Sequence, residues 1–247
     1  MTDLFDLAAR LDEAALSGRA MAQPDLESAD DGYAVQADLV ARRLARGDTP
    51  AGVKLGFTST AKMAQMGISE VIIGRLTRDA AVADGGALDI SGLIHPRVEP
   101  EVAFRIAGAE APYVDAVAPA LEIIDSRYRD FRFSLGDVIA DNTSAAAYVI
   151  GNWLPLDRID IGNRGVLLEI DGAVVETGST AAILGDPMRA IGRALGLAAR
   201  LGIPVPAGSI LLAGAATAAA PLAGGVHVRA TVAGLGTAGF HTTGGAS

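Results

Sequence analysis

Apolar side chains recur every three or four residues in several parts of the chain, which is the spacing of one helix face. The first such segment ends just before Gly18, a typical helix stop. Near residue 190, Asp186 and Pro187 stand where a helix N-cap and first turn prefer them. In that segment Gly192 and Gly196 lie four residues apart, which favours close packing against a sheet. The spacing predicts helices over residues 4–15, 31–44, 59–66 and 187–201.

Most of the remaining apolar residues stand in short runs rich in β-branched side chains, which are typical of strands. We predict strands over residues 53–57, 93–106, 117–125, 146–154, 166–175, 210–212 and 226–232. Two helices come first and strands dominate afterwards, an order that indicates an α+β fold rather than alternating βαβ units. We therefore divide the chain into a helical segment, residues 1–49, and a β-rich domain, residues 50–247.

The composition argues against several classes of protein. Half of the 247 residues are apolar but only 4% are aromatic, so we expect a core of small aliphatic side chains. A net charge of −9 disfavours nucleic acids and anionic membranes as partners. The absence of cysteine removes disulfides and cysteine-ligated zinc. Because the first residues carry acids where a secretion signal carries bases, we expect a cytoplasmic protein with no membrane span.

Two closely spaced glutamates form the first chemical signal. Alternate residues of an extended strand share a face, so Arg97, Glu99 and Glu101 are expected on one side of their strand. Two like charges on one face repel unless a cation lies between them, and a divalent ion with oxygen ligands meets that need. The alternative is a solvated strand face beside Arg97. Pro100, which has no N–H to donate, favours an edge strand or a bulge.

Glu122 interrupts a run that is otherwise apolar from residue 116 to 124. A buried carboxylate without a partner costs several kcal/mol. Either a core Lys or Arg neutralises it, or it shares a metal ion with Glu99 and Glu101. Three carboxylates leave open coordination positions on such an ion, and a bidentate 2-oxo acid can fill them. The residues therefore indicate a candidate site for a divalent cation and a small 2-oxo acid, with a neutralising core Lys or Arg as the alternative.

Lys54 raises the converse question, because it is the one charged residue in the apolar run of residues 52–57. It either neutralises a buried acid or acts on a substrate, where its ammonium can donate a proton or stabilise an enolate oxygen. Ser144 closes a polar cluster that is typical of turns and caps, but its hydroxyl could also bind a substrate carboxylate. A G-x-G-x-x-G match at residues 234–239 is set aside, since too few residues follow it for a phosphate-binding helix.

Five motifs stand in order along the chain: GVKLGFTS at 52–59, AKMAQMG at 61–67, LIHPRVEPE at 93–101, IDSRYRDFRF at 124–133 and ADNTS at 140–144. Together they resemble the 4-oxalocrotonate decarboxylases, which belong with the 2-hydroxypentadienoate hydratases in the fumarylacetoacetase superfamily. The resemblance covers nearly the whole chain. It implies a mixed β-roll core preceded by a helical segment, and an oligomeric assembly.

The resemblance also implies roles for particular residues. The implied metal ligands are Glu99, Glu101 and Glu122. The implied active-site lysine is Lys54. The implied substrate contacts are Ser144, Gly214 and Thr217, the last two in a C-terminal loop of the active site.

Decarboxylases and hydratases of this kind share these residues. Hydratases usually carry an aspartate shortly before the glycine that matches Gly74, where this chain has Ile72 and Ile73. The implied reaction is therefore the Mg²⁺- or Mn²⁺-dependent decarboxylation of 2-oxohex-3-enedioate to 2-hydroxypenta-2,4-dienoate, in meta-cleavage degradation of aromatic compounds. The alternative is the hydratase that acts on this dienoate. Weaker alternatives are a hydrolase of acylpyruvates and a non-catalytic subunit. The resemblance also makes the hydratase a candidate partner of this chain.

Overall fold

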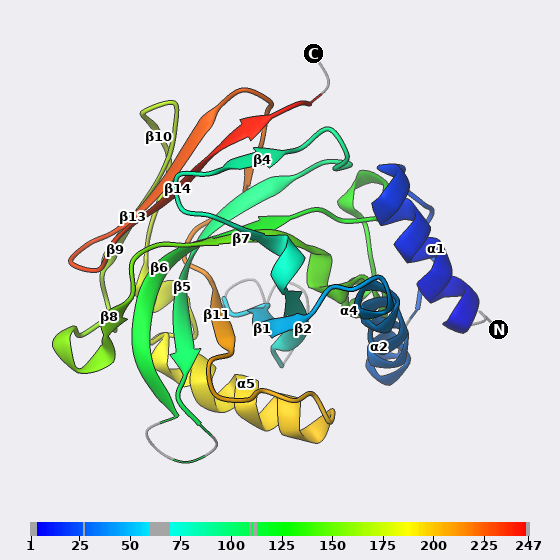
Figure 1. The fold of residues 1–247 in the computed structure, drawn as a ribbon, viewed down its shortest axis with the longest axis horizontal. Coiled ribbons are helices and arrows are strands. Elements are labelled where there is room, and N and C mark those ends of the chain that lie inside the picture. The colour runs from blue at the N-terminus through cyan, green and yellow to red at the C-terminus, as the bar shows by residue number, and fades with distance from the viewer. Residues whose placement is uncertain (1–3, 27, 60–69, 109, 111–112, 246–247) are drawn as a thin grey trace.

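The computed structural model describes residues 4–26, 28–59, 70–108, 110 and 113–245. These residues build two β-sheets with helices at their margins (Figure 1). The predicted helix at 59–66 and the motif at 61–67 lie outside the described residues, apart from residue 59.

The larger sheet contains nine strands of the described chain, in the order β2-β1-β11-β5-β6-β7-β3, with β12 paired to β5 and β8 paired to β6. Its strands are β1 (Pro50–Gly56), β2 (Ile72–Thr77), β3 (Ala81–Val82), β5 (Arg97–Ile106), β6 (Val114–Ile124), β7 (Ala145–Ile150), β8 (Leu154–Pro155), β11 (Ile210–Ala215) and β12 (Ala220–Pro221). The smaller sheet contains five strands in the order β10-β9-β13-β14-β4. They are β4 (Ala87–Asp89), β9 (Gly165–Ile170), β10 (Ala173–Ser179), β13 (His227–Val232) and β14 (Gly236–Thr243).

The α-helices are α1 (Leu4–Ser17), α2 (Ala29–Ala45), α4 (Leu135–Ala140) and α5 (Met188–Arg200). Single 3₁₀ turns are η1 (Arg78–Ala80), η2 (Arg129–Phe131), η3 (Asn142–Ser144), η4 (Leu156–Arg158) and η5 (Thr180–Ala182). None of the helices in the described ranges is both long and apolar enough to cross a membrane.

The two sheets pack face to face through small aliphatic side chains. Alternate residues of β13 point inward, as Val228 and Ala230 do, and meet Val98 and Leu121 of the larger sheet. Phe240 is the largest ring in this layer. The expected core of small aliphatic residues is confirmed.

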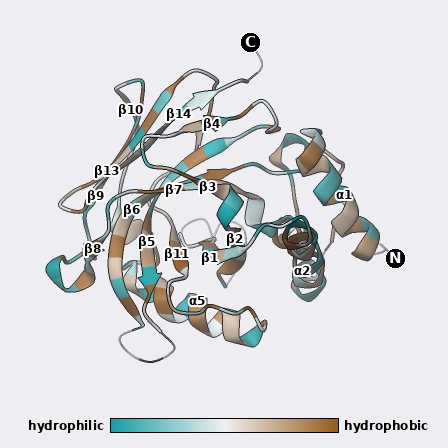
Figure 2. Ribbon diagram, viewed as in Figure 1, coloured by the Kyte–Doolittle hydropathy of each residue, from teal (hydrophilic) through white to brown (hydrophobic). Residues whose placement is uncertain are grey.

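Helix α5 covers the far side of the larger sheet, and apolar and polar residues alternate along it (Figure 2). Its buried face consists of Ala190, Ile191, Ala194, Leu197 and Ala198. Gly192 and Gly196 lie on the exposed face, where an added Cβ would meet no atom of the described residues within 4 Å. The prediction that these glycines pack against a sheet is wrong, because the apolar stripe lies on the other side of the helix.

Helices α1 and α2 confirm the predicted N-terminal helical segment, and α2 begins after Ser28, whose hydroxyl accepts from the N–H of Asp31. Leu7 and Leu39 of these helices share a small core with Tyr128. The division of the chain at residue 50 stays a prediction.

Three other expectations need correction. Pro100 lies in β5, which is an interior strand rather than an edge, and the bulge is in its neighbour β11. The predicted strand at 166–175 is a hairpin of β9 and β10, because Asp171 and Gly172 both adopt positive φ and turn the chain. The smaller sheet also uses β14, a strand that was not predicted and that includes most of the G-x-G-x-x-G match.

Candidate metal and substrate site

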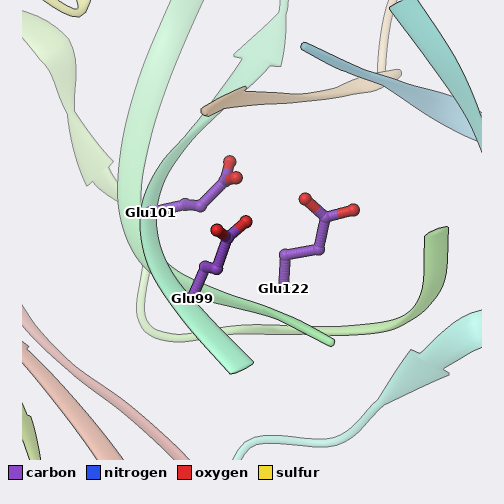
Figure 3. Close-up of side chains that lie close together, drawn as sticks. All are labelled: Glu99, Glu101 and Glu122. Atoms are coloured by element: carbon purple, nitrogen blue, oxygen red, sulfur yellow. The ribbon is translucent and has the colours of Figure 1, made fainter. Parts of the chain in front are cut away.

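Three carboxylates converge because of the register between β5 and β6. Glu99 lies directly opposite Glu122 in this antiparallel pair, and Glu101, two residues along β5, faces the same side. One oxygen of each side chain lies within 4.8 Å of the others. Figure 3 shows the three groups facing a common space. We call these residues the carboxylate cluster. Like charges placed opposite each other destabilise a sheet, so the arrangement requires a compensating cation.

Burial makes the carboxylate cluster costly in the absence of such a cation. The side chains of Glu101 and Glu122 are each only 1% exposed. Burial, reinforced by the charge of Glu122, raises the pKa of Glu101 well above its usual value. Burial also raises the pKa of Glu122, although nearby Lys54 opposes the shift. Glu101 Oε1 and Glu122 Oε2 have no hydrogen-bond donor in the described part of the chain.

Lys54 supplies part of the missing positive charge. Its Nζ lies 2.6 Å from Glu122 Oε1 and donates a hydrogen bond to Thr143 O at 3.1 Å. Lys54 therefore neutralises a buried acid, and it also lines the adjoining cavity, so both interpretations of this residue have structural support. Carboxylate oxygens are hard ligands, so three that converge in a nearly enclosed space suit a divalent cation such as Mg²⁺ or Mn²⁺.

Gly74 allows the chain to close around Lys54. The two residues are partners in the antiparallel pairing of β1 and β2. A Cβ on Gly74 would lie 2.3 Å from Thr143 Oγ1 and 3.0 Å from Lys54 Cγ. Any larger residue would push the turn at 142–144 away from the lysine.

That turn is strained. Asn142, Thr143 and Ser144 adopt φ values of 48°, 54° and 59°, and such conformations cost about 1–3 kcal/mol each. The side chain of Asn142 holds the turn, because its Oδ1 accepts from Arg75 N at 2.8 Å and its Nδ2 donates to Arg75 O at 2.9 Å. The turn presents Thr143 O to Lys54 and leaves the Ser144 hydroxyl buried beside the cavity, where none of the described residues forms a hydrogen bond with it.

A buried ion pair between Arg127 and Asp141 supports the turn from behind. Arg127 also donates to the carbonyl oxygens of Asp125, at 2.6 Å, and Ala145, at 3.3 Å. Burial raises the pKa of Asp141 to about 6 against the opposing influence of Arg127. This pair was not identified from the sequence, and Arg127 in it is only 2% exposed. Its place between two apolar strands was the available signal.

A cavity of about 400 Å³ adjoins the carboxylate cluster, which is within the usual range for small-molecule sites. Its polar lining includes Lys54, Arg97, Glu99, Ser144 and Thr217. Its apolar lining includes Phe57, Ile72, Ile124, Phe131, Phe133 and Val138. The structure thus brings the predicted lysine, serine and threonine to the same cavity.

Gly214, which the resemblance implies is a substrate contact, lies beside Glu101 and is not part of the described cavity lining. It sits in the bulge of β11 with φ 114°, and its N–H donates to Glu101 Oε2 at 2.8 Å. A side chain here would collide with Thr58, since an added Cβ would lie 2.1 Å from Thr58 Oγ1. Gly214 therefore orients Glu101, and Thr217 of the same loop reaches the cavity. Their role as substrate contacts stays a prediction.

Comparison with known proteins identifies the family. The chain is 50% identical to the 4-oxalocrotonate decarboxylase of Pseudomonas sp. over 250 aligned residues, and this alignment covers 96% of this chain and 97% of that relative. This chain belongs to the 4-oxalocrotonate decarboxylase family. A solved family member, 4-oxalocrotonate decarboxylase from Pseudomonas putida G7 complexed with magnesium and adipate, matches it with a TM-score of 0.91 and 35% identity over 97% of both chains.

Proteins with other activities are also similar to this chain, in sequence or in fold. The 2-keto-4-pentenoate hydratase of Paraburkholderia xenovorans (strain LB400) is 36% identical over 203 residues, which cover 78% of this chain and 75% of the hydratase. Fumarylpyruvate hydrolase from Pseudomonas aeruginosa shares the fold, with a TM-score of 0.62 and 15% identity over 79% of this chain and 90% of its own. No family model matches the chain. The predicted resemblance and the α+β fold of the fumarylacetoacetase type are confirmed.

Proposed function

We propose that this chain is a Mg²⁺- or Mn²⁺-dependent decarboxylase that converts 2-oxohex-3-enedioate to 2-hydroxypenta-2,4-dienoate and CO₂. The observation that carries the proposal is the carboxylate cluster, whose three side chains converge within 4.8 Å of one another beside a cavity of about 400 Å³. The 50% identity to a 4-oxalocrotonate decarboxylase supports the choice of reaction. The likeness to a decarboxylase complexed with magnesium supports the choice of metal.

Glu99, Glu101 and Glu122 would hold the cation. The bound ion would supply Lewis acidity at the 2-oxo acid end of the substrate. The chain's own residues then set the geometry of the reacting groups. Gly214 fixes one oxygen of Glu101, and Lys54 fixes one oxygen of Glu122.

Decarboxylation breaks the C5–C6 bond of the substrate and releases CO₂. The electron pair of that bond passes through the conjugated C3–C4 double bond to the oxygen on C2, and protonation of that oxygen gives the dienol. Lys54 Nζ is positioned at the chelating end of the cavity, where its ammonium can donate a hydrogen bond or a proton to the developing oxyanion. The apolar wall that includes Ile72 and Phe133 limits the access of water to the diene.

The same site could serve a hydratase, because relatives of both kinds match the chain. Purified protein with Mg²⁺ should be incubated separately with 2-oxohex-3-enedioate and with 2-hydroxypenta-2,4-dienoate. Release of CO₂ from the first substrate supports the proposal. Formation of 4-hydroxy-2-oxopentanoate from the second, without CO₂ from the first, would assign the chain to the hydratases instead.

Assembly is a further part of the proposal. We infer a homo-oligomer that also associates with a 2-hydroxypentadienoate hydratase. The support for a contact surface is the exposure of apolar side chains on the edge strand β10 and its neighbour β9: Val174 and Val175 of β10 are 53% and 43% exposed, and Leu167 of β9 is 39% exposed. Light scattering after gel filtration, with and without the hydratase, measures both associations, and a purely monomeric protein would contradict the inference.

A further inference from the structure

The strand register places an arginine next to the carboxylate cluster. On one face of the larger sheet, Glu99 pairs with Glu122, and two residues further along the same strands Arg97 pairs with Ile124. Two residues of strand span about 6.8 Å, so the Arg97 position is one strand repeat from the cluster. Exposure increases in the same direction, because Glu101 is buried, Glu99 is half-buried and Arg97 is exposed. Arg97 therefore stands at the mouth of the cavity.

The guanidinium of Arg97 has no carboxylate partner in the described ranges, where the salt bridges involve other residues. It lies over the ring of Phe131, 5.1 Å from the centroid, and both residues line the cavity. This stacking holds the cation at the cavity rather than in bulk water. Lys54, the other cation of the lining, is already engaged with Glu122 and Thr143 O.

Ser144 lies on the other side of β6 from Arg97. Ile124 pairs with Arg97 on one side and with Ala145, the neighbour of Ser144, on the other. The Ser144 hydroxyl is buried, lines the cavity and meets no hydrogen-bond partner among the residues that the structure describes. A cation and an unpartnered hydroxyl thus flank Ile124 at the end of the cavity away from Glu101.

We propose that Arg97 is the specificity-determining residue of this site and binds the far carboxylate of a six-carbon dicarboxylate, with the Ser144 hydroxyl as a second donor. The inference rests on the proposed function and adds to it the recognition of the second carboxylate. Five carbon–carbon bonds of about 1.5 Å, in zigzag, separate the two carboxyl carbons by about 6 Å, close to one strand repeat. A ligand that chelates at the carboxylate cluster can therefore reach Arg97 with its other end.

The pairing has a kinetic signature. The far carboxylate leaves as neutral CO₂, so an ion pair with Arg97 stabilises the bound substrate more than the transition state. Loss of Arg97 should therefore raise KM and leave kcat unchanged or higher. A residue with a merely structural role would not produce this split.

The test measures ligand binding to the Mg²⁺-loaded protein by calorimetry, with adipate, hexanoate and oxalate as probes. Arg97→Met keeps the length and apolar contact of the side chain, and Arg132→Met is the matched control, because Arg132 is exposed and absent from the cavity lining. We expect Arg97→Met to bind adipate about five- to tenfold more weakly, with hexanoate and oxalate unchanged. Arg132→Met should bind all three probes as the unaltered protein does.

Two results would overturn the inference: equal adipate affinity in Arg97→Met and the unaltered protein, or an equal loss of oxalate binding, which would place Arg97 at the chelating end. The outcomes also separate the two proposals. If the unaltered protein prefers adipate through Arg97 but releases no CO₂ from 2-oxohex-3-enedioate, the proposed function fails and the inference stands. If CO₂ is released while Arg97→Met keeps both its adipate affinity and its KM, the inference fails and the proposed function stands.

Discussion

Replacing Glu101 by Gln should change stability in opposite directions with and without metal. In the metal-free protein, ionised carboxylates within 4.8 Å of each other repel by about 3.5 kcal/mol at an effective dielectric constant of 20. Lys54 and partial protonation offset much of this, because burial raises the pKa of Glu101. We expect E101Q to stabilise the metal-free protein by about 1–2 kcal/mol. The amide oxygen of Gln can still accept the Gly214 N–H bond.

With Mg²⁺ the order should reverse. A ligand at about 100 times its Kd stabilises the folded state by about 2.7 kcal/mol. The unaltered protein should gain this amount, whereas E101Q, which lacks one charged ligand, should gain little. Thermal unfolding in EDTA and in Mg²⁺ measures both effects, at about 2–4 °C per kcal/mol for a chain of this size.

The exposed Glu13 on α1 provides the control, since E13Q should change neither transition. The reasoning is refuted if E101Q is less stable than the unaltered protein in EDTA and still gains full stabilisation from Mg²⁺. That pattern would mean that Glu101 is structurally required and does not bind the ion.

Three further predictions follow from the same contacts. Lys54→Met should abolish decarboxylation and destabilise the metal-free protein by about 3–5 kcal/mol, because it leaves Glu122 buried and unpaired; urea unfolding measures the loss. Gly74→Ala should lower both kcat and the free energy of unfolding, the latter by about 1–3 kcal/mol, because the added Cβ would collide with Thr143. Its control is Gly192→Ala on the exposed face of α5, which should leave the stability unchanged or raise it by up to about 1 kcal/mol. Burial raises the pKa of Glu101 and Glu122, so their ionisation destabilises the metal-free protein as the pH rises. Mg²⁺ must also displace the protons that these two carboxyl groups hold. Affinity for Mg²⁺ should therefore increase with pH, with proton release detectable by calorimetry in two buffers of different ionisation enthalpy; pH-independent binding would contradict this.

Local signals were sufficient for several elements of the fold. Helix α5 begins one residue from the expected position, and Asp186 caps it by accepting from Met188 N at 2.9 Å. The alternation of Glu99 and Glu101 correctly placed both on one strand face. Strand β14 was missed, because its small and glycine residues lack a strand signature and its partners are distant in sequence.

The site required information that no local pattern contains. The contact between Lys54 and Glu122 depends on the parallel pairing of β1 with β11 and on the register of β5 with β6. The burial of Arg127 depends on Asp141, which arrives from a different turn. Pro100 is tolerated inside the sheet because its neighbour β11 has a bulge beside it. In the sequence, Gly214 was the one sign of this bulge, and its positive φ could not be predicted from its neighbours.

The hydrogen bond that the Gly214 N–H donates to Glu101 also bears on how many oxygens of this side chain can bind an ion. One oxygen of Glu101 accepts a hydrogen bond from a backbone N–H, and one oxygen of Glu122 is paired with the Lys54 ammonium. This arrangement favours coordination of an ion through the other oxygen of each side chain. Calcium sites commonly fill their larger shells with carboxylates that bind through both oxygens, whereas magnesium takes six ligands in an octahedron. If the carboxylate cluster holds an ion, a peptide group two strands away from Glu122 would thus limit the number of glutamate oxygens that reach it and would leave coordination positions for an incoming chelator.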